Sequence, residues 1–239
     1  MLLILAFQPS ARRWRAVNGA MIARARRAGR LYLRSPYLII IALPLLPFEA
    51  ANWMVPLDYW ILTLPPRFIV TSVVVAAMIW ASGSIILGER AHVLPSFAAA
   101  FANFGNVLVV DLALFAAVLL LFTVIALPVG VYLFVRWWFA TQAVMLLDKP
   151  SAQALSFSSS IVRGSWWWTA GQLTALLMVG AIAWVLIALV SAQLGDASRG
   201  LLTYAWTALA LPYATIFQTI LFYERLERAE QVAPTPILV

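Results

Sequence analysis

Long apolar stretches follow one another along almost the whole chain, separated by short connections that contain proline or polar residues. A transmembrane helix needs about 20 predominantly apolar residues. Six stretches reach that length, so the pattern predicts an all-α fold, a polytopic membrane helix bundle of about six transmembrane helices. The predicted spans are residues 31–54, 67–87, 106–127, 129–147, 166–194 and 201–223.

The third and fourth predicted spans come from one nearly uninterrupted apolar run, residues 106–147. As a single helix this run would be about 63 Å long at ~1.5 Å per residue, which is roughly twice the ~30 Å hydrocarbon core. Pro128, Val129 and Gly130 lie near its middle and are typical of a turn. The run therefore predicts two crossings joined at Pro128.

Three further segments are predicted to be amphipathic interfacial helices, because their apolar residues recur at helical spacing. The first is rich in arginine and is expected to lie on anionic lipid headgroups. The second is the most apolar, and the third is mixed with serines. Their apolar positions are Trp14, Val17, Met21, Ala25 and Ala28, then Leu94, Phe97, Phe101, Phe104 and Leu108, then Ala154, Leu155, Phe157, Ile161 and Val162.

Basic residues are concentrated before the first predicted span, with no acidic residue among them. Such clustering is typical of the cytoplasmic side of a membrane protein. It predicts cytoplasmic termini in a bacterial inner membrane, with anionic lipid headgroups rather than nucleic acid as the partner. The predicted headgroup residues are Arg12, Arg13, Arg15, Arg24, Arg26, Arg27, Arg30 and Arg34.

The chain is thus predicted to have three parts: a basic amphipathic segment at residues 1–30, a six-helix transmembrane domain at 31–230, and a tail at 231–239. Consecutive tryptophans at 166–168 predict an aromatic belt where a span enters the lipid. Small residues recur along the second span and predict close helix packing; they are Ala77, Ala81, Ser84 and Gly88.

A repeat of span, surface helix and span is also suggested by the sequence. Glu89 precedes Gly105 by sixteen residues, and Asp148 precedes Gly164 by the same distance. Repeats are common in membrane folds.

Composition argues against an enzyme. The chain is 64% hydrophobic and has no cysteine, which excludes disulfides and thiolate metal sites. Its one histidine, His92, is expected in a solvated loop. Glycine-rich phosphate loops and hydrolase motifs are absent from the sequence. We therefore predict no catalytic residue, no metal site and no cofactor.

Asp111 and Arg136 stand out because each lies inside an apolar span. An ionised side chain there costs ~2.5–3.5 kcal/mol on insertion scales, and such residues are commonly functional. They predict either a polar contact that stabilises the fold or a polar transport site centred on Arg136, and the structural interpretation is favoured.

Arg136, Asp148 and the string at residues 158–167, SSSIVRGSWW, resemble the glycerophosphoryl diester phosphodiesterase membrane-domain family and related bacterial six-helix membrane proteins of unknown function. The C-terminal part of the chain is similar to the family too. Two positions depart from the family pattern: Asp148 stands where the family has glutamate, and Phe222 stands where it has tyrosine. The resemblance implies a six-helix fold with surface helices and marks Asp148, Ser158, Gly164, Trp167, Pro212, Tyr223 and Glu224.

The sequence therefore predicts a non-catalytic integral membrane protein. We expect an accessory or scaffolding subunit, or a lipid-associating component of a membrane assembly, which binds membrane lipids and other membrane subunits. The alternative is a small transporter or permease that uses Arg136 and Asp111.

Overall fold

The structure is a computed structural model that describes residues 11–47, 60–123, 125–191, 193 and 196–232. All regular elements in these ranges are helices and none is a strand, so the all-α prediction is confirmed. The elements are α1 (Ala11–Leu33), α2 (Tyr37–Ala42), the short 3₁₀ helix η2 (Leu43–Leu45), α4 (Trp60–Ile86), α5 (Val93–Ala102), α6 (Phe104–Leu121), α7 (Leu127–Trp137), α8 (Ala140–Leu147), α9 (Ser151–Val162), α10 (Trp166–Ser191) and α11 (Asp196–Val232).

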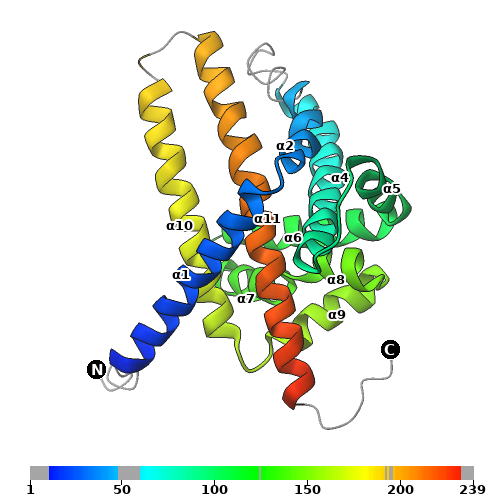
Figure 1. The fold of residues 1–239 in the computed structure, drawn as a ribbon, viewed down its shortest axis with the longest axis vertical. Coiled ribbons are helices and arrows are strands. Elements are labelled where there is room, and N and C mark those ends of the chain that lie inside the picture. The colour runs from blue at the N-terminus through cyan, green and yellow to red at the C-terminus, as the bar shows by residue number, and fades with distance from the viewer. Residues whose placement is uncertain (1–10, 48–59, 124, 192, 194–195, 233–239) are drawn as a thin grey trace.

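Three long helices, α4, α10 and α11, run lengthwise through the molecule (Figure 1). Helix α1 crosses α11 obliquely and packs against it. The shorter helices α5, α8 and α9 gather beside α4 and the lower half of α11 (Figure 1). The start of α1 and the end of α11 lie at the same end of the molecule, which is lowest in Figure 1.

Five helical segments in the described part of the chain are long and apolar enough to cross a membrane. They match the second to sixth predicted spans and are Leu62–Ile86, Phe104–Leu121, Leu127–Leu147, Trp166–Val190 and Tyr204–Ala229. The chain therefore has the helices of a multi-pass membrane protein.

The first predicted span, residues 31–54, is not one continuous helix. Helix α1 ends at Leu33, and the chain turns before the six-residue helix α2. Pro36 accounts for this break, because the residue before a proline is disfavoured in helical conformation. Residues 48–54 of this prediction lie outside the described residues.

The turn between the third and fourth spans lies earlier than predicted. Helix α6 ends at Leu121, and Pro128 stands in the first turn of α7 instead of in the connection. Proline suits this position because the first helical N–H groups have no intrahelical partner. Gly130 is buried where α7 crosses α6, and an added Cβ would lie 2.9 Å from the Ala117 carbonyl oxygen.

Helix α4 is the most buried long helix, and its small residues form its packed side. Ala77 and Ala81 are fully buried and Ser84 is nearly so, as the sequence predicts. Gly88 instead ends the helix: it has a positive φ of 84°, and the next amide, of Glu89, donates to the Ser84 carbonyl. This is a Schellman ending, for which glycine is the preferred residue.

The predicted repeat of span, surface helix and span stays a prediction, and the order of the helices agrees with it in part. Helices α4, α5 and α6 are followed later by the similar series α8, α9 and α10. Asp148 ends α8 in the left-handed region, at φ 51°, in the role that Gly88 has at the end of α4. The two glycines do not correspond, since Gly105 lies inside α6 and Gly164 forms the α9–α10 turn at φ 79°.

Two of the three predicted amphipathic segments form helices that bury part of their apolar stripe against the bundle. Helix α1 buries Ala28, and α9 buries Ala154, Ile161 and Val162. The second stripe differs, because it is divided at Asn103 between α5 and α6 and Phe101 is exposed. Side chains before residue 22 lie outside the described residues.

Candidate functional site

Asp111, one of the two intramembrane charges, is held by hydroxyl groups from two other helices. Thr141 Oγ1 of α8 donates to its Oδ1 at 3.0 Å, and the Ser72 side chain of α4 also forms a hydrogen bond with it. Ser72 and Thr141 are both buried. The carboxylate therefore joins α4, α6 and α8 through polar contacts.

Arg136, the other intramembrane charge, has a partner on its own helix. Its Nη1 donates to the Tyr132 hydroxyl at 2.9 Å, and its guanidinium lies 5.2 Å from the centre of the Tyr132 ring. No ion pair joins Arg136 to Asp111 in the described residues. The two predicted residues are therefore not brought together into one polar site.

Ser158 bridges a break in the fourth predicted span. The helix is interrupted at Trp138 and Phe139, between α7 and α8. The Ser158 hydroxyl of α9 donates to the Arg136 carbonyl at 2.7 Å and accepts from the Phe139 amide at 3.2 Å. Backbone groups freed inside a membrane need such partners, so the predicted Ser158 position has a structural role here.

Trp168 of α10 lies among three arginines. The Arg225 guanidinium carbon is 3.7 Å from the ring centroid, close enough for stacking, and those of Arg24 and Arg228 are at 5.0 and 5.6 Å. Helix α1 supplies Arg24, and α11 supplies Arg225 and Arg228. We call Trp168, these three arginines and the adjacent Glu224 the arginine–tryptophan cluster.

Glu224 compensates one arginine of the cluster. Arg24 Nε donates to both of its carboxylate oxygens, at 2.9 and 2.7 Å. This contact spans 200 residues of sequence and fixes α1 to α11. The Tyr213 hydroxyl of α11 adds a hydrogen bond to the Ala25 carbonyl at 3.4 Å.

Arg225 is buried without such compensation. It is 5% exposed, and its Nε and Nη2 are covered and have no hydrogen-bond partner in the described structure. Arg24 Nη1 is likewise covered and has no hydrogen-bond partner in the described structure. A buried ion costs several kcal/mol, whereas a desolvated cation–π contact contributes about 2 kcal/mol. Trp168 and Glu224 therefore leave positive charge uncompensated.

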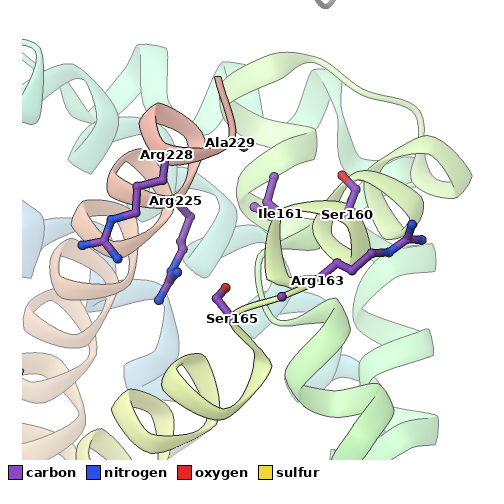
Figure 2. A pocket seen from close by; sticks show the side chains of 8 residues that line it. Ser160, Ile161, Arg163, Ser165, Arg225, Arg228 and Ala229 are labelled. Carbon is purple, nitrogen blue, oxygen red and sulfur yellow. The ribbon is translucent and has the colours of Figure 1, made fainter. Parts of the chain in front are cut away.

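A cavity of about 470 Å³ opens beside the cluster, between the α9–α10 turn and the end of α11. Figure 2 shows Arg225 and Arg228 extending to the same side of α11, with the Ser165 hydroxyl nearby. Arg163 also lines the cavity, but its guanidinium points away from the two α11 arginines (Figure 2). A second cavity adjoins the first and is lined by Trp166, Trp167 and Trp168.

The other predicted motif positions surround this region or stabilise α11. Gly164 lines the cavity and has a positive φ that other residues rarely adopt. Trp167 is 72% exposed, as expected for a residue of an aromatic belt. Pro212 is buried inside α11, and Tyr223 lies partly buried near Gly83 of α4.

The predicted headgroup arginines of α1 divide into two groups. Arg26, Arg27, Arg30 and Arg34 are exposed, whereas Arg24 is buried in the cluster. The side chains of Arg12, Arg13 and Arg15 lie outside the described residues. His92 is exposed just before α5, and the described residues contain no group of three side chains suited to a metal ion.

The cluster as a unit is not predictable from local sequence patterns. Arg225 and Arg228 read as charges that follow a span, and Trp168 reads as part of an aromatic belt. One local feature does point to the cluster. Glu224 and Arg225 lie within one turn of an apolar helix, and charged residues buried in such a helix need polar partners. Their partner Arg24 is 200 residues away and shares no local pattern with them.

Comparison with known proteins adds no assignment to this geometry, and the resemblance to the glycerophosphoryl diester phosphodiesterase membrane-domain family stays a prediction. No family model matches the chain, and no curated protein or solved structure matches it either.

Proposed function

We propose that this chain is a non-catalytic, lipid-associating component of a membrane assembly in a bacterial inner membrane. The observation that carries the proposal is the exposed apolar surface of α10. Its apolar window has a mean hydropathy of 2.7, yet only 6% of that window is buried. Water is a poor solvent for such a surface, whereas lipid tails or the apolar helices of another subunit would cover it.

The proposed topology has about six spans and both termini in the cytoplasm. In its favour, the start of α1 and the end of α11 lie at the same end of the molecule (Figure 1). Arg228 lies near the end of α11 and so toward that end, whereas the exposed Arg26, Arg27, Arg30 and Arg34 lie in and just after the later part of α1, away from its start. Arginine on one side of the membrane favours a cytoplasmic position for that side.

The alternative function, a small transporter that uses Arg136 and Asp111, has less support. Each of these residues is bonded to its own neighbours, Tyr132 in one case and Ser72 and Thr141 in the other. A transport site near the bilayer midplane would need polar groups that converge on one substrate.

The test is to extract the protein gently from its native membranes and to analyse it by native mass spectrometry. We expect it to resist alkaline carbonate extraction and to retain phospholipid or a second subunit in a fixed ratio. Solute-dependent stabilisation of the lone protein, abolished by Arg136→Gln and unaffected by the exposed control Arg34→Gln, would overturn the proposal. Phosphodiester hydrolysis by the pure chain would also overturn it.

A further inference from the structure

We infer that the arginine–tryptophan cluster and the adjoining cavity form a binding site for a phosphate-bearing anion. The site itself stands on its own geometry, but a lipid headgroup as the source of the phosphate rests on the proposed function.

The cluster carries more positive than negative charge. Three guanidinium groups surround the Trp168 ring, while Glu224 is the acid that contacts them, through Arg24. Two positive charges are therefore left over. The guanidinium groups repel one another because they carry like charge around one ring. An anion bound between α10 and α11 would offset that repulsion.

Arg225 has buried donors, Nε and Nη2, without a hydrogen-bond partner in the described structure. A buried polar group without a partner in a native structure calls for an explanation, of which a bound ion is one. Arg225 is 95% buried, since its exposure is 5%, and it lines both adjoining cavities. Its guanidinium carbon lies 3.7 Å from the centre of the Trp168 ring, so the aromatic ring covers one side of the group.

The start of α10 lies beside the same cavity. Ser165 and Gly164 line it, and α10 begins with the next residue, Trp166. The first N–H groups of a helix lack intrahelical partners and carry partial positive charge, so they favour phosphate. The positive φ of Gly164 turns the chain sharply between α9 and this helix start.

The chemistry of these donors favours phosphate over other anions. Guanidinium groups bind phosphate oxygens in a paired geometry, and here two of them accompany a helix start. At about 470 Å³, the cavity has a volume typical of small-molecule sites. The exposed Trp167 beside it offers an apolar contact to whatever carries the phosphate.

The experiment uses the full-length protein washed into neutral detergent, with inorganic phosphate, phosphatidylglycerol and phosphatidylcholine as three separate probes. We expect phosphate or phosphatidylglycerol to raise the melting temperature by several degrees, and equal amounts of phosphatidylcholine to have little effect. A response to inorganic phosphate indicates a soluble phosphate compound, and a response to phosphatidylglycerol alone indicates a lipid headgroup.

Two variants assign the effect to the site. Arg225→Gln should weaken the apparent affinity at least tenfold, and Arg228→Gln, at an exposed position, at least threefold. Arg90→Gln removes the same charge from an exposed position between α4 and α5, outside both cavities and outside the predicted headgroup arginines, and should respond like the wild type. The inference is overturned if no probe stabilises the wild type, or if Arg228→Gln responds as Arg90→Gln does.

These outcomes separate the two proposals. A phosphate response in a protein that also proves to be a transporter would keep the site and overturn the proposed function. A protein that retains lipid in membranes but gives equal responses in all three arginine variants would keep the proposed function and overturn the site.

Discussion

Helices α4 and α10 are nearly equal in length, 27 and 26 residues, and both are strongly apolar. Their surroundings nevertheless differ. In α4, 61% of the apolar window is buried, against 6% in α10, although α10 has the higher mean hydropathy of 2.7 compared with 2.1. Hydropathy therefore shows that both helices are apolar enough to cross a membrane, but it does not distinguish the centre of the bundle from its periphery.

The difference in burial between α4 and α10 depends on which small residues each helix has and on what those residues contact. The packed side of α4 combines alanines such as Ala77 with buried serines, one of which, Ser72, bonds Asp111. Small residues let membrane helices approach closely, and hydroxyl groups then bond across the interface. Helix α10 also has glycines, but Gly171 and Gly180 have no neighbour within 4 Å of an added Cβ.

Helix α10 is packed only near its beginning. Thr169, Gln172 and Leu173 are buried, whereas Met178, Val179 and Ile182 are more than half exposed. The buried part lies beside the arginine–tryptophan cluster, and the exposed part extends away from it along the upper half of α11 (Figure 1). One helix thus combines a contact with the polar end of the bundle and a surface for lipid or a partner.

The largest expected effect comes from placing a charge on the exposed part of α10. Met178 is 56% exposed and lies near the middle of the span Trp166–Val190. If lipid surrounds it, Met178→Arg should cost about 2.5–3.5 kcal/mol in membrane insertion. A reporter fused after α11 should then show a reduced inserted fraction.

The control for this charge is Ser156→Arg, at an exposed position of the short helix α9. It should insert normally. Equal insertion of Met178→Arg and Ser156→Arg would show that water reaches this part of α10, and the comparison with α4 would then lose its basis.

A smaller effect is expected from enlarging a small residue on the packed helix. Ala77 is fully buried, and Ala77→Leu adds three carbon atoms to a filled interface. Overpacking typically costs 1–3 kcal/mol, so we expect a loss of about 2 kcal/mol in the free energy of unfolding, measured in mixed micelles with increasing SDS.

The matched variant is Ala181→Leu on α10, where the alanine is exposed. It should change stability by less than about 0.5 kcal/mol, the range usual for surface positions. Equal destabilisation by the two substitutions would indicate that α10 is packed as tightly as α4.

Sequence reasoning finds the crossing helices because their signal is local. Apolar length alone identifies the five segments from Leu62 to Ala229. It places the α6–α7 turn too late, because Pro128 is compatible both with a turn and with the start of a helix. It also makes residues 31–54 one span, although Pro36 interrupts that segment.

The candidate site is harder to predict because its parts are distant in sequence. Glu224 and Arg225 are neighbours, but Trp168 and Arg24 come from two other helices. Each residue alone fits an ordinary role, namely a headgroup contact, a belt tryptophan or a charge that follows a span. Only the packing of α1 and α10 against α11 brings the charges together, and that packing has no local pattern.

The smallest effect is expected from a substitution that adds a single methyl group, Gly130→Ala. Gly130 sits where α7 crosses α6, and a Cβ there would lie 2.9 Å from the Ala117 carbonyl and 3.0 Å from Leu120 Cβ. Because the nearest atom belongs to the backbone, Gly130→Ala requires the two helices to move apart. We expect a loss of about 1 kcal/mol, the lower end of overpacking costs, in the same unfolding assay.

Gly180→Ala on α10 adds the same methyl group where nothing lies within 4 Å. Alanine is favoured over glycine inside a helix by roughly 0.5–1 kcal/mol, so this variant should be unchanged or more stable. The two substitutions therefore differ in sign although their chemistry is identical. A loss of stability in Gly180→Ala would mean that a partner helix approaches α10 closely, and lipid alone would then not account for its exposed surface.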